Sequence, residues 1–269
     1  MNTPATPATP VPSPQDLAGR PVAALRVTAK ALRTAPAAEH TAILGRLAAS
    51  AVPEARCVAG YAAAWFVLRH QDDDARSLVD PLVGDGDWTV REAATFGVRE
   101  ALVADAGRVL PLVRRWAAEG RGDREHRAFL VVARQPKRQT PSVVEELIRL
   151  LRVPLADDAP YVRKNVPFCL RYLARTHPHV LAPALREWSA ADDRWLSRAC
   201  VTALTGELLA AEPHTAADVA RRLRRSGDDW TVRRLPALQE PPVPTATVGV
   251  PLDSSPSGVP LNSPSPGAE

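Results

Sequence analysis

The segment GDGDWTVREAATF, residues 84–96, places an aromatic side chain and a carboxylate at a spacing that suits chemistry. Trp88 and Glu92 are four residues apart, so they are neighbours on the surface of any helix that starts here. An aromatic face attracts cations, and a carboxylate stabilises a developing positive charge and orients a water for attack. The pair is therefore a candidate for a reaction that passes through a cation. Alternatively, Trp88 is a packing residue at a helix start and Glu92 a solvated charge that favours the helix dipole.

An arginine recurs through the chain at steps of 35 or 36 residues, and this repeat indicates the elements that must position the pair. Steps of this length are typical of paired-helix repeats. Between successive arginines, two segments with apolar residues at helical spacing are separated by a break, for example at 105–107 and at Pro178. No segment alternates with period two for long enough to predict a sheet. The recurring residues are Arg56, Arg91, Arg127, Arg163, Arg198 and Arg233.

We therefore predict an all-α fold, a right-handed solenoid of about six helical-hairpin repeats, each burying an apolar stripe against its neighbours. Residues 1–15 contain five prolines and no charged side chain, and residues 239–269 contain eight prolines. Such segments cannot bury enough apolar area to fold, so both are predicted to be disordered tails. The repeat domain is then expected over residues 16–238.

An acidic residue precedes a Val-Arg pair at the same interval in two repeats. Asp85 precedes Val90-Arg91, and Asp157 precedes Val162-Arg163. This signature resembles HEAT repeats, in which such acids and arginines form ion pairs between adjacent repeats. The resemblance implies a structural role for Arg91 and Arg163, as an alternative to contact with a ligand.

Three further segments, DWTVRE, HRAFL and YVRKNVPFCLRYLARTHP, are similar to stretches of the AlkC/AlkD-type DNA alkylation repair glycosylases, a superfamily built from HEAT-like repeats. The similarity covers about residues 80–200. Members hydrolyse the N-glycosidic bond of positively charged N3- and N7-alkylated purines. The resemblance implies that Glu92 is the catalytic carboxylate and Trp88 its aromatic partner, and Phe168 falls where the AlkD branch has a second tryptophan. Arg127 matches a family arginine that approaches the DNA backbone.

The chain also departs from both branches. The AlkD branch has an aspartate at the position of Glu92, and two further acids of the AlkC branch align with Val131 and Tyr172. One acid combined with aromatic residues places the sequence nearer to the AlkD arrangement. Trp65, one repeat earlier, is a weaker third aromatic candidate.

The chemistry that the resemblance implies suits these residue types. A cationic alkylpurine needs no protonation to leave, so one carboxylate near C1′ is enough to stabilise the oxocarbenium ion and orient a water. Aromatic rings stack on the sugar and base. Basic side chains position the duplex through its phosphates. The expected DNA contacts are Arg127, Lys164, Arg171, Arg91 and Arg163.

Composition permits an anionic partner. The chain has 34 Lys and Arg against 30 Asp and Glu, and three of the acids lie in residues 239–269, so the rest of the chain carries a net charge of +7. Cys57, Cys169 and Cys200 are an odd number at wide spacings in apolar segments, which indicates reduced thiols in a core. With no signal peptide and no apolar run of membrane-spanning length, a cytoplasmic monomer is expected, nucleoid-associated if it binds DNA.

No glycine-rich phosphate loop and no Cys or His pair at zinc spacing is present, so we expect no cofactor and no metal. The predicted function is repair of alkylated duplex DNA by base release. The alternative is a non-catalytic HEAT-repeat scaffold that holds DNA or a protein partner. In that case Phe168 is a core residue, and Lys164 and Arg171 are ordinary surface charges.

Overall fold

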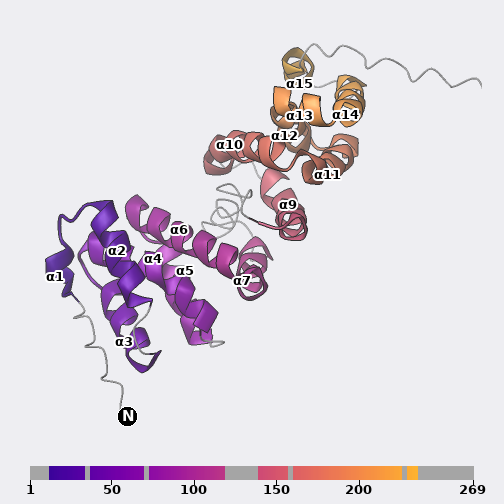
Figure 1. The fold of residues 1–269 in the computed structure, drawn as a ribbon. Coiled ribbons are helices and arrows are strands. Elements are labelled where there is room, and N and C mark those ends of the chain that lie inside the picture. The colour runs from indigo at the N-terminus through magenta and orange to yellow at the C-terminus, as the bar shows by residue number, and fades with distance from the viewer. Residues whose placement is uncertain are drawn as a thin grey trace, which may run out of the picture.

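The computed structural model describes residues 12–33, 37–69, 73–118, 139–156, 160–225 and 229–235 (Figure 1). All regular elements in these ranges are helices and none is a strand, which confirms the all-α class. The helices are α1 (Pro14–Leu17), α2 (Val22–Leu32), α3 (Ala37–Ala48), α4 (Pro53–Arg69), α5 (Asp73–Val83), α6 (Trp88–Ala104), α7 (Ala106–Ala118), α9 (Pro141–Ala156), α10 (Pro160–Thr176), α11 (Pro178–Ala190), α12 (Arg194–Ala203), α13 (Gly206–Ala211), α14 (Pro213–Arg225) and α15 (Asp229–Arg234).

Prolines and carboxylates set the helix starts. Several helices begin at a proline, including α4, α9, α11 and α14, because its fixed φ suits the first helical position and its missing N–H would have no partner there. Asp193 caps α12 by accepting hydrogen bonds from the backbone N–H groups of Trp195 and Leu196. The two predicted breaks are confirmed, since α6 and α7 are separated at Asp105 and α11 begins at Pro178.

The first helix begins inside the segment assigned to the N-terminal tail. α1 starts at Pro14, and the Leu17 side chain is fully buried. The cause is a capping box, in which the Ser13 hydroxyl accepts from the backbone N–H of Asp16 while the Asp16 carboxylate accepts from the N–H of Ser13. Proline content alone therefore misplaces this boundary by a few residues.

The helices form two layers. Layer one contains α3, α5, α7, α9, α11 and α14, and layer two contains α2, α4, α6, α10, α12 and α15. In layer two, α2 packs on α4, α4 on α6, α10 on α12 and α12 on α15. In layer one, α3 contacts α5, α7 contacts α9, α9 contacts α11, and α11 contacts α14. Successive helices alternate between the layers from α2 to α7 and again from α9 to α12, as expected for a helical solenoid.

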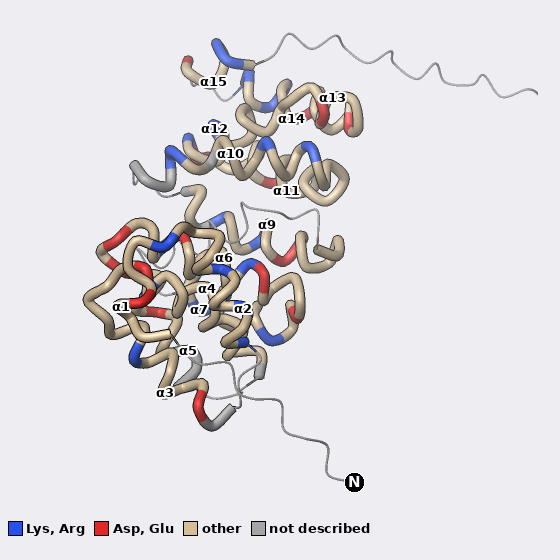
Figure 2. Tube along the Cα trace, turned by 60° about the vertical axis from the view of Figure 1, so that its left-hand side comes forward, with Lys and Arg blue, Asp and Glu red and all other residues tan. Residues whose placement is uncertain are grey.

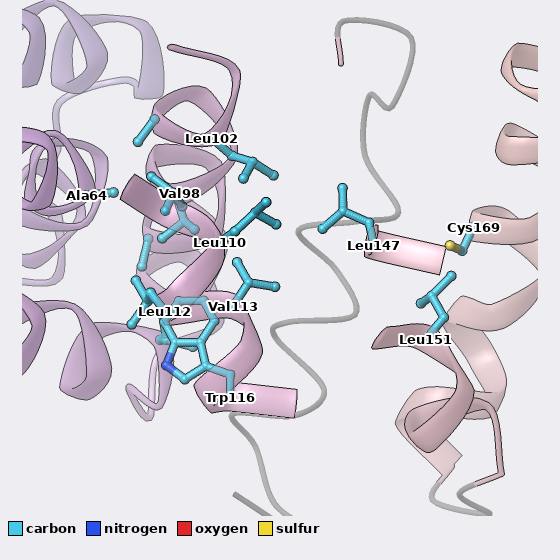
Figure 3. Packing of buried hydrophobic residues seen from close by; sticks show 14 of the residues in the cluster. Ala64, Val98, Leu102, Leu110, Leu112, Val113, Trp116, Leu147, Leu151 and Cys169 are labelled. Atoms are coloured by element: carbon cyan, nitrogen blue, oxygen red, sulfur yellow. The ribbon is translucent and has the colours of Figure 1, made fainter. Parts of the chain in front are cut away.

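One contiguous apolar core connects the layers from Leu17 in α1 to Leu223 in α14. Figure 3 shows its central part, where buried side chains of α6 and α7 lie on one side and Leu147, Leu151 and Cys169 on the other. All three cysteines are buried and free, as predicted. None of the described helices is long and apolar enough to cross a membrane.

α4 and α6 approach each other at the backbone. A Cβ atom added to Gly97 of α6 would lie 2.5 Å from the carbonyl oxygen of Gly60 in α4 and 3.0 Å from that of Tyr61. A Cβ atom added to Gly60 would lie 2.8 Å from the backbone nitrogen of Ala94. Glycine at both positions is therefore what lets the two helices pack this closely.

A buried carboxylate joins α7 to α9. The Arg114 Nε donates to Glu146 Oε1 at 2.7 Å, and Arg149 also pairs with this carboxylate. Burial alone would raise the pKa of Glu146, but the hydrogen bond and charge of Arg114, together with the charge of Arg149, lower it overall. The ion pair links the helices on either side of residues 119–138, which lie outside the described ranges.

We predict that Gly97→Ala lowers the free energy of unfolding by about 2 kcal/mol, because its methyl group would overlap backbone atoms that cannot rotate away. Gly45→Ala in α3 is the matched control, since no atom lies within 4 Å of the added Cβ. That variant should gain about 0.5–1 kcal/mol from helix propensity. Urea denaturation of both variants measures the difference, and equal changes in the two would contradict the close contact.

Glu146→Gln is predicted to destabilise the protein at neutral pH by on the order of 1–3 kcal/mol, because it leaves the arginines facing a neutral amide. The pKa of Glu146 is lowered in the folded state, so its stabilisation is present above the ordinary value of 4.5 and is lost as the pH falls through the lower folded value. The stability gap between wild type and variant should therefore narrow as the pH falls below 4.5 and close once the pH lies below the folded pKa of Glu146.

Glu187→Gln is the control for this measurement. Glu187 pairs with Arg152 at 2.9 Å, but both side chains are more than half exposed. Its loss should cost less than about 1 kcal/mol at any pH. A gap of the same size for both variants would show that burial of Glu146 does not matter.

Candidate functional site

Trp88 and Glu92 lie at the start of α6, one helical turn apart. Trp88 is the first residue of the helix and its side chain is 68% exposed, whereas Glu92 is half-buried. Asp87 caps the helix by accepting from the Thr89 N–H at 2.7 Å and from the Thr89 hydroxyl at 2.6 Å. These hydrogen bonds lower the pKa of Asp87 and keep it ionised at the helix start. The helix end that carries the pair is therefore well fixed.

The turn before α6 is tied to the preceding repeat. Asp85 accepts a hydrogen bond from the backbone N–H of Asp87 at 2.8 Å, and both of its carboxylate oxygens accept from Arg56, at 2.8 and 3.3 Å. This bidentate pair is one step of the ion-pair ladder expected between adjacent repeats. It holds the Trp88 end of α6 against α4.

The repeat arginines hold the breaks between helices. Arg56, Arg91 and Arg163 each donate from one terminal guanidinium nitrogen to two successive backbone carbonyls of the segment before their own helix. The distances are 2.9 and 3.2 Å for Arg56, 2.8 and 2.9 Å for Arg91, and 3.1 and 2.6 Å for Arg163, and the acceptors are Ser50 and Ala51, Asp85 and Gly86, and Pro154 and Leu155. These bonds give Arg91 and Arg163 a structural role. Their contact with DNA stays a prediction.

Trp88 differs from the two tryptophans that share its place in the repeat. Each of Trp88, Trp195 and Trp230 lies three residues before a repeat arginine. Trp195 and Trp230 are half-buried and have guanidinium groups over their rings at 4.5–4.9 Å. Among the described residues no guanidinium stacks on Trp88. Its exposure is therefore a departure from the repeat, and the alternative that Trp88 packs in the structure is not met.

Phe168 is also exposed, and it belongs to a second row of aromatic residues. Tyr61, Phe96 and Phe168 each lie five residues after a repeat arginine. Tyr61 is buried and meets Phe96 edge to face at 5.6 Å, and Arg26 and Arg99 cover Phe96 at 4.0 and 4.4 Å. Phe168 is 66% exposed, so it is not the core residue that the alternative requires. The row was missed in the sequence, although the constant offset of five residues from a repeat arginine was visible there.

The exposed ring of Phe168 lies within a basic stripe on α10. Lys164, Phe168, Arg171 and Arg175 follow the spacing i, i+4, i+7 and i+11, so they share one face of the helix, and all four are exposed. Arg175 also lies over the ring of Tyr172 at 5.1 Å. Figure 2 shows Lys and Arg positions along α10. Arg175 was not predicted as a DNA contact, although it lies on the same helix face as Lys164 and Arg171.

Arg33 contacts two further residues of this region, Glu100 and Trp65. Glu100, a second acid on α6, pairs with Arg33 at 3.0 Å. The guanidinium of Arg33 also covers the ring of Trp65 at 4.4 Å, which occupies one face of that weaker candidate. Glu92 is the acid of α6 that lies one helical turn after the exposed Trp88 ring.

The structure brings together some of the candidate residues but not all. Trp88 and Glu92 share α6, and Lys164, Phe168 and Arg171 share α10. Arg127 and Val131 lie in residues 119–138, outside the described ranges, so the convergence of the two groups on one site stays a prediction. Within the described residues no group of His, Cys, Asp and Glu side chains has an arrangement that could hold a metal ion.

Comparison with known proteins identifies the family. A family model described as DNA alkylation repair enzyme matches residues 12–186, from α1 into α11, and this range includes Trp88, Glu92 and Phe168. No curated protein and no solved structure matches the chain. The match covers well over half of the sequence and confirms the resemblance recognised in its α6 and α10 segments. The chain belongs to the DNA alkylation repair enzyme family.

Proposed function

We propose that this protein is a DNA glycosylase that binds duplex DNA and hydrolyses the N-glycosidic bond of cationic N3- or N7-alkylpurines. One observation carries the proposal. Trp88 is 68% exposed one turn before Glu92, whereas its two repeat equivalents are covered by arginines. An exposed indole ring gives up the hydrophobic stabilisation that burial would provide, and a ligand that stacks on the ring would restore it. The family match supports DNA as the ligand.

The chemistry requires little of the protein beyond charge and position. The alkylated base already carries a positive charge, so it leaves without protonation by a general acid. Positive charge then develops on the deoxyribose, where the Glu92 carboxylate stabilises it and orients the attacking water. The Trp88 ring attracts the same cation through its π face. The exposed Phe168 ring supplies a second, weaker face.

The α10 stripe fits the backbone of the duplex. Lys164, Arg171 and Arg175 present three cations on one helix face, beside Phe168. Contacts of this kind position a duplex without reading its sequence, and they make affinity fall with salt. Arg127 is proposed as a fourth phosphate contact on the basis of the family resemblance. Arg91 and Arg163 are proposed to hold the fold, in view of their bonds to backbone carbonyls.

We further propose that the two layers are a right-handed solenoid of about six HEAT-like repeats. The support is the common behaviour of Arg56, Arg91 and Arg163, each of which closes the break before a layer-two helix. This repeat places residues at one phase on one edge of layer two. Lesion binding along that edge would bring α6 and α10 to the same duplex.

Glu92→Gln is predicted to lower the rate of 7-methylguanine or 3-methyladenine release from methylated duplex DNA by roughly a hundredfold or more, since it removes the negative charge near the developing cation. Glu145→Gln is the matched control, because Glu145 is exposed on α9 in layer one. Release is measured on purified protein at low salt, with circular dichroism to verify folding.

One result would reject the enzyme, and duplex binding would then distinguish the alternatives. If wild type releases no more base than Glu92→Gln while both are folded, the catalytic proposal fails. Salt-dependent binding to the duplex without any release would then favour the DNA-binding scaffold, and absence of DNA binding would favour a protein scaffold.

Trp88→Ala is predicted to lower DNA affinity, whereas Trp195→Ala is predicted to lower thermal stability. Trp88→Ala should leave the melting temperature nearly unchanged, because most of the ring already faces solvent, while DNA affinity falls by about 1–3 kcal/mol of stacking energy. Trp195→Ala should lower the melting temperature, because Arg163, Arg194 and Arg198 lose the ring they surround. Thermal denaturation and fluorescence anisotropy measure the two effects. Equal destabilisation by both substitutions would restore the packing role of Trp88.

A further inference from the structure

Arginines and tryptophans alternate across α10, α12 and α15, and those of α12 and α15 lie beyond the residues that the family model matches. Trp195 has the guanidinium carbons of Arg163, Arg194 and Arg198 at 4.5, 4.8 and 4.9 Å from its ring centre. Trp230 has those of Arg198 and Arg234 at 4.8 and 4.5 Å. We call Arg194, Trp195, Arg198, Trp230 and Arg234 the α12–α15 strip. The match ends at residue 186, before this strip begins.

Two arginines of the strip, Arg194 and Arg234, carry positive charge that the described residues do not neutralise. Among them neither Arg194 nor Arg234 forms an ion pair, and both are exposed. On the neighbouring layer-one helix α14, by contrast, Arg221 and Arg222 pair with Asp218 at 3.3 and 2.9 Å. Figure 2 shows Lys and Arg positions on α10, α12 and α15, the layer-two helices within residues 160–235. An anionic partner would relieve the repulsion between these cations.

Stacking also prepares the guanidinium groups to bind. A guanidinium that lies over an aromatic ring uses its π face, so its N–H donors remain available in the plane to meet phosphate oxygens in pairs. Stacking on Trp195 and Trp230 restricts the long arginine side chains before any ligand arrives, which lowers the entropy cost of binding.

The position of the strip in the repeat indicates the partner. Trp195 and Trp230 have the same phase as Trp88, so they mark the same end of their layer-two helices. α10 packs on α12, and α12 packs on α15, so the strip continues from the helix that carries Lys164, Phe168 and Arg171. Two helix spacings of 8–10 Å span roughly 16–20 Å, which corresponds to about 5–6 base pairs of duplex at 3.4 Å each.

We propose that the α12–α15 strip binds the backbone phosphates of the duplex arm that flanks the lesion on the α10 side. This inference rests on the proposed DNA partner, but it does not depend on base release. The strip contributes affinity and position, whereas Trp88 and Glu92 carry the chemistry.

The test compares two double variants of the full chain that remove equal charge. Arg194→Gln with Arg234→Gln alters the strip, and Arg224→Gln with Arg225→Gln alters exposed arginines of α14 in layer one. Fluorescence anisotropy with an unmodified duplex of about 20 base pairs is recorded over a range of NaCl concentrations. The slope of log affinity against log salt should fall by about 2 for the strip variant and remain as in wild type for the α14 variant.

Base release separates this inference from the proposed function. The strip variant should keep kcat and raise KM, because the residues of the candidate site are untouched. Arg194→Lys with Arg234→Lys retains the charge and should restore most of the salt slope, which excludes misfolding as the cause of the loss.

The outcomes are distinguishable. If wild type and strip variant bind duplex with the same affinity and salt slope, the strip is not a phosphate contact, even where base release is observed. An equal loss in the α14 variant would also overturn it. Preference of the strip for single-stranded RNA over duplex would assign a different partner. If wild type binds no duplex, the proposed function fails together with the strip.

Discussion

The hydrogen bonds from the repeat arginines to backbone carbonyls are the interaction on which the arrangement of the candidate site depends. Arg56 and Arg91 each bind two carbonyls at the break before their helix, and Arg163 binds two in the last turn of α9. Carbonyls at such breaks have no partner within a helix, so a guanidinium that satisfies two of them fixes the entry of the chain into the next helix. Residues at a constant offset from each arginine therefore recur at the same place along layer two.

Side chains at the same offset from a repeat arginine differ in what covers them, and the exposed ones are the candidates for binding. At three residues before the arginine, Trp195 and Trp230 are covered by guanidinium groups and Trp88 is not. At five residues after it, Tyr61 is buried and Phe168 is exposed. The fold supplies the same position each time, and the neighbouring repeat decides whether the ring packs or faces solvent. Exposed rings beside Glu92 and in the α10 stripe are the departures that a charged nucleotide could use.

Several features could be read from the sequence because their causes are local. Apolar periodicity predicted the helices, and Asp105 and Pro178 predicted breaks that the structure confirms. The buried free cysteines and the family were also predicted correctly. The start of α1 was not, because the proline count of the tail concealed a capping box between Ser13 and Asp16. The aromatic row through Phe96 was missed, because the search followed the arginine and not the residues at fixed offsets from it.

The sequence by itself determined the helical class, the repeat interval and the residue types available to the site, since these follow from short-range spacing and from the chemistry of single side chains. Only the tertiary structure decided which of them are exposed. Arg56 precedes Trp88 by one repeat as Arg198 precedes Trp230, yet Trp230 is covered by this preceding arginine and Trp88 is not. Arg56 instead binds the Asp85 carboxylate. Competition between partners that are distant in sequence is settled by three-dimensional packing alone.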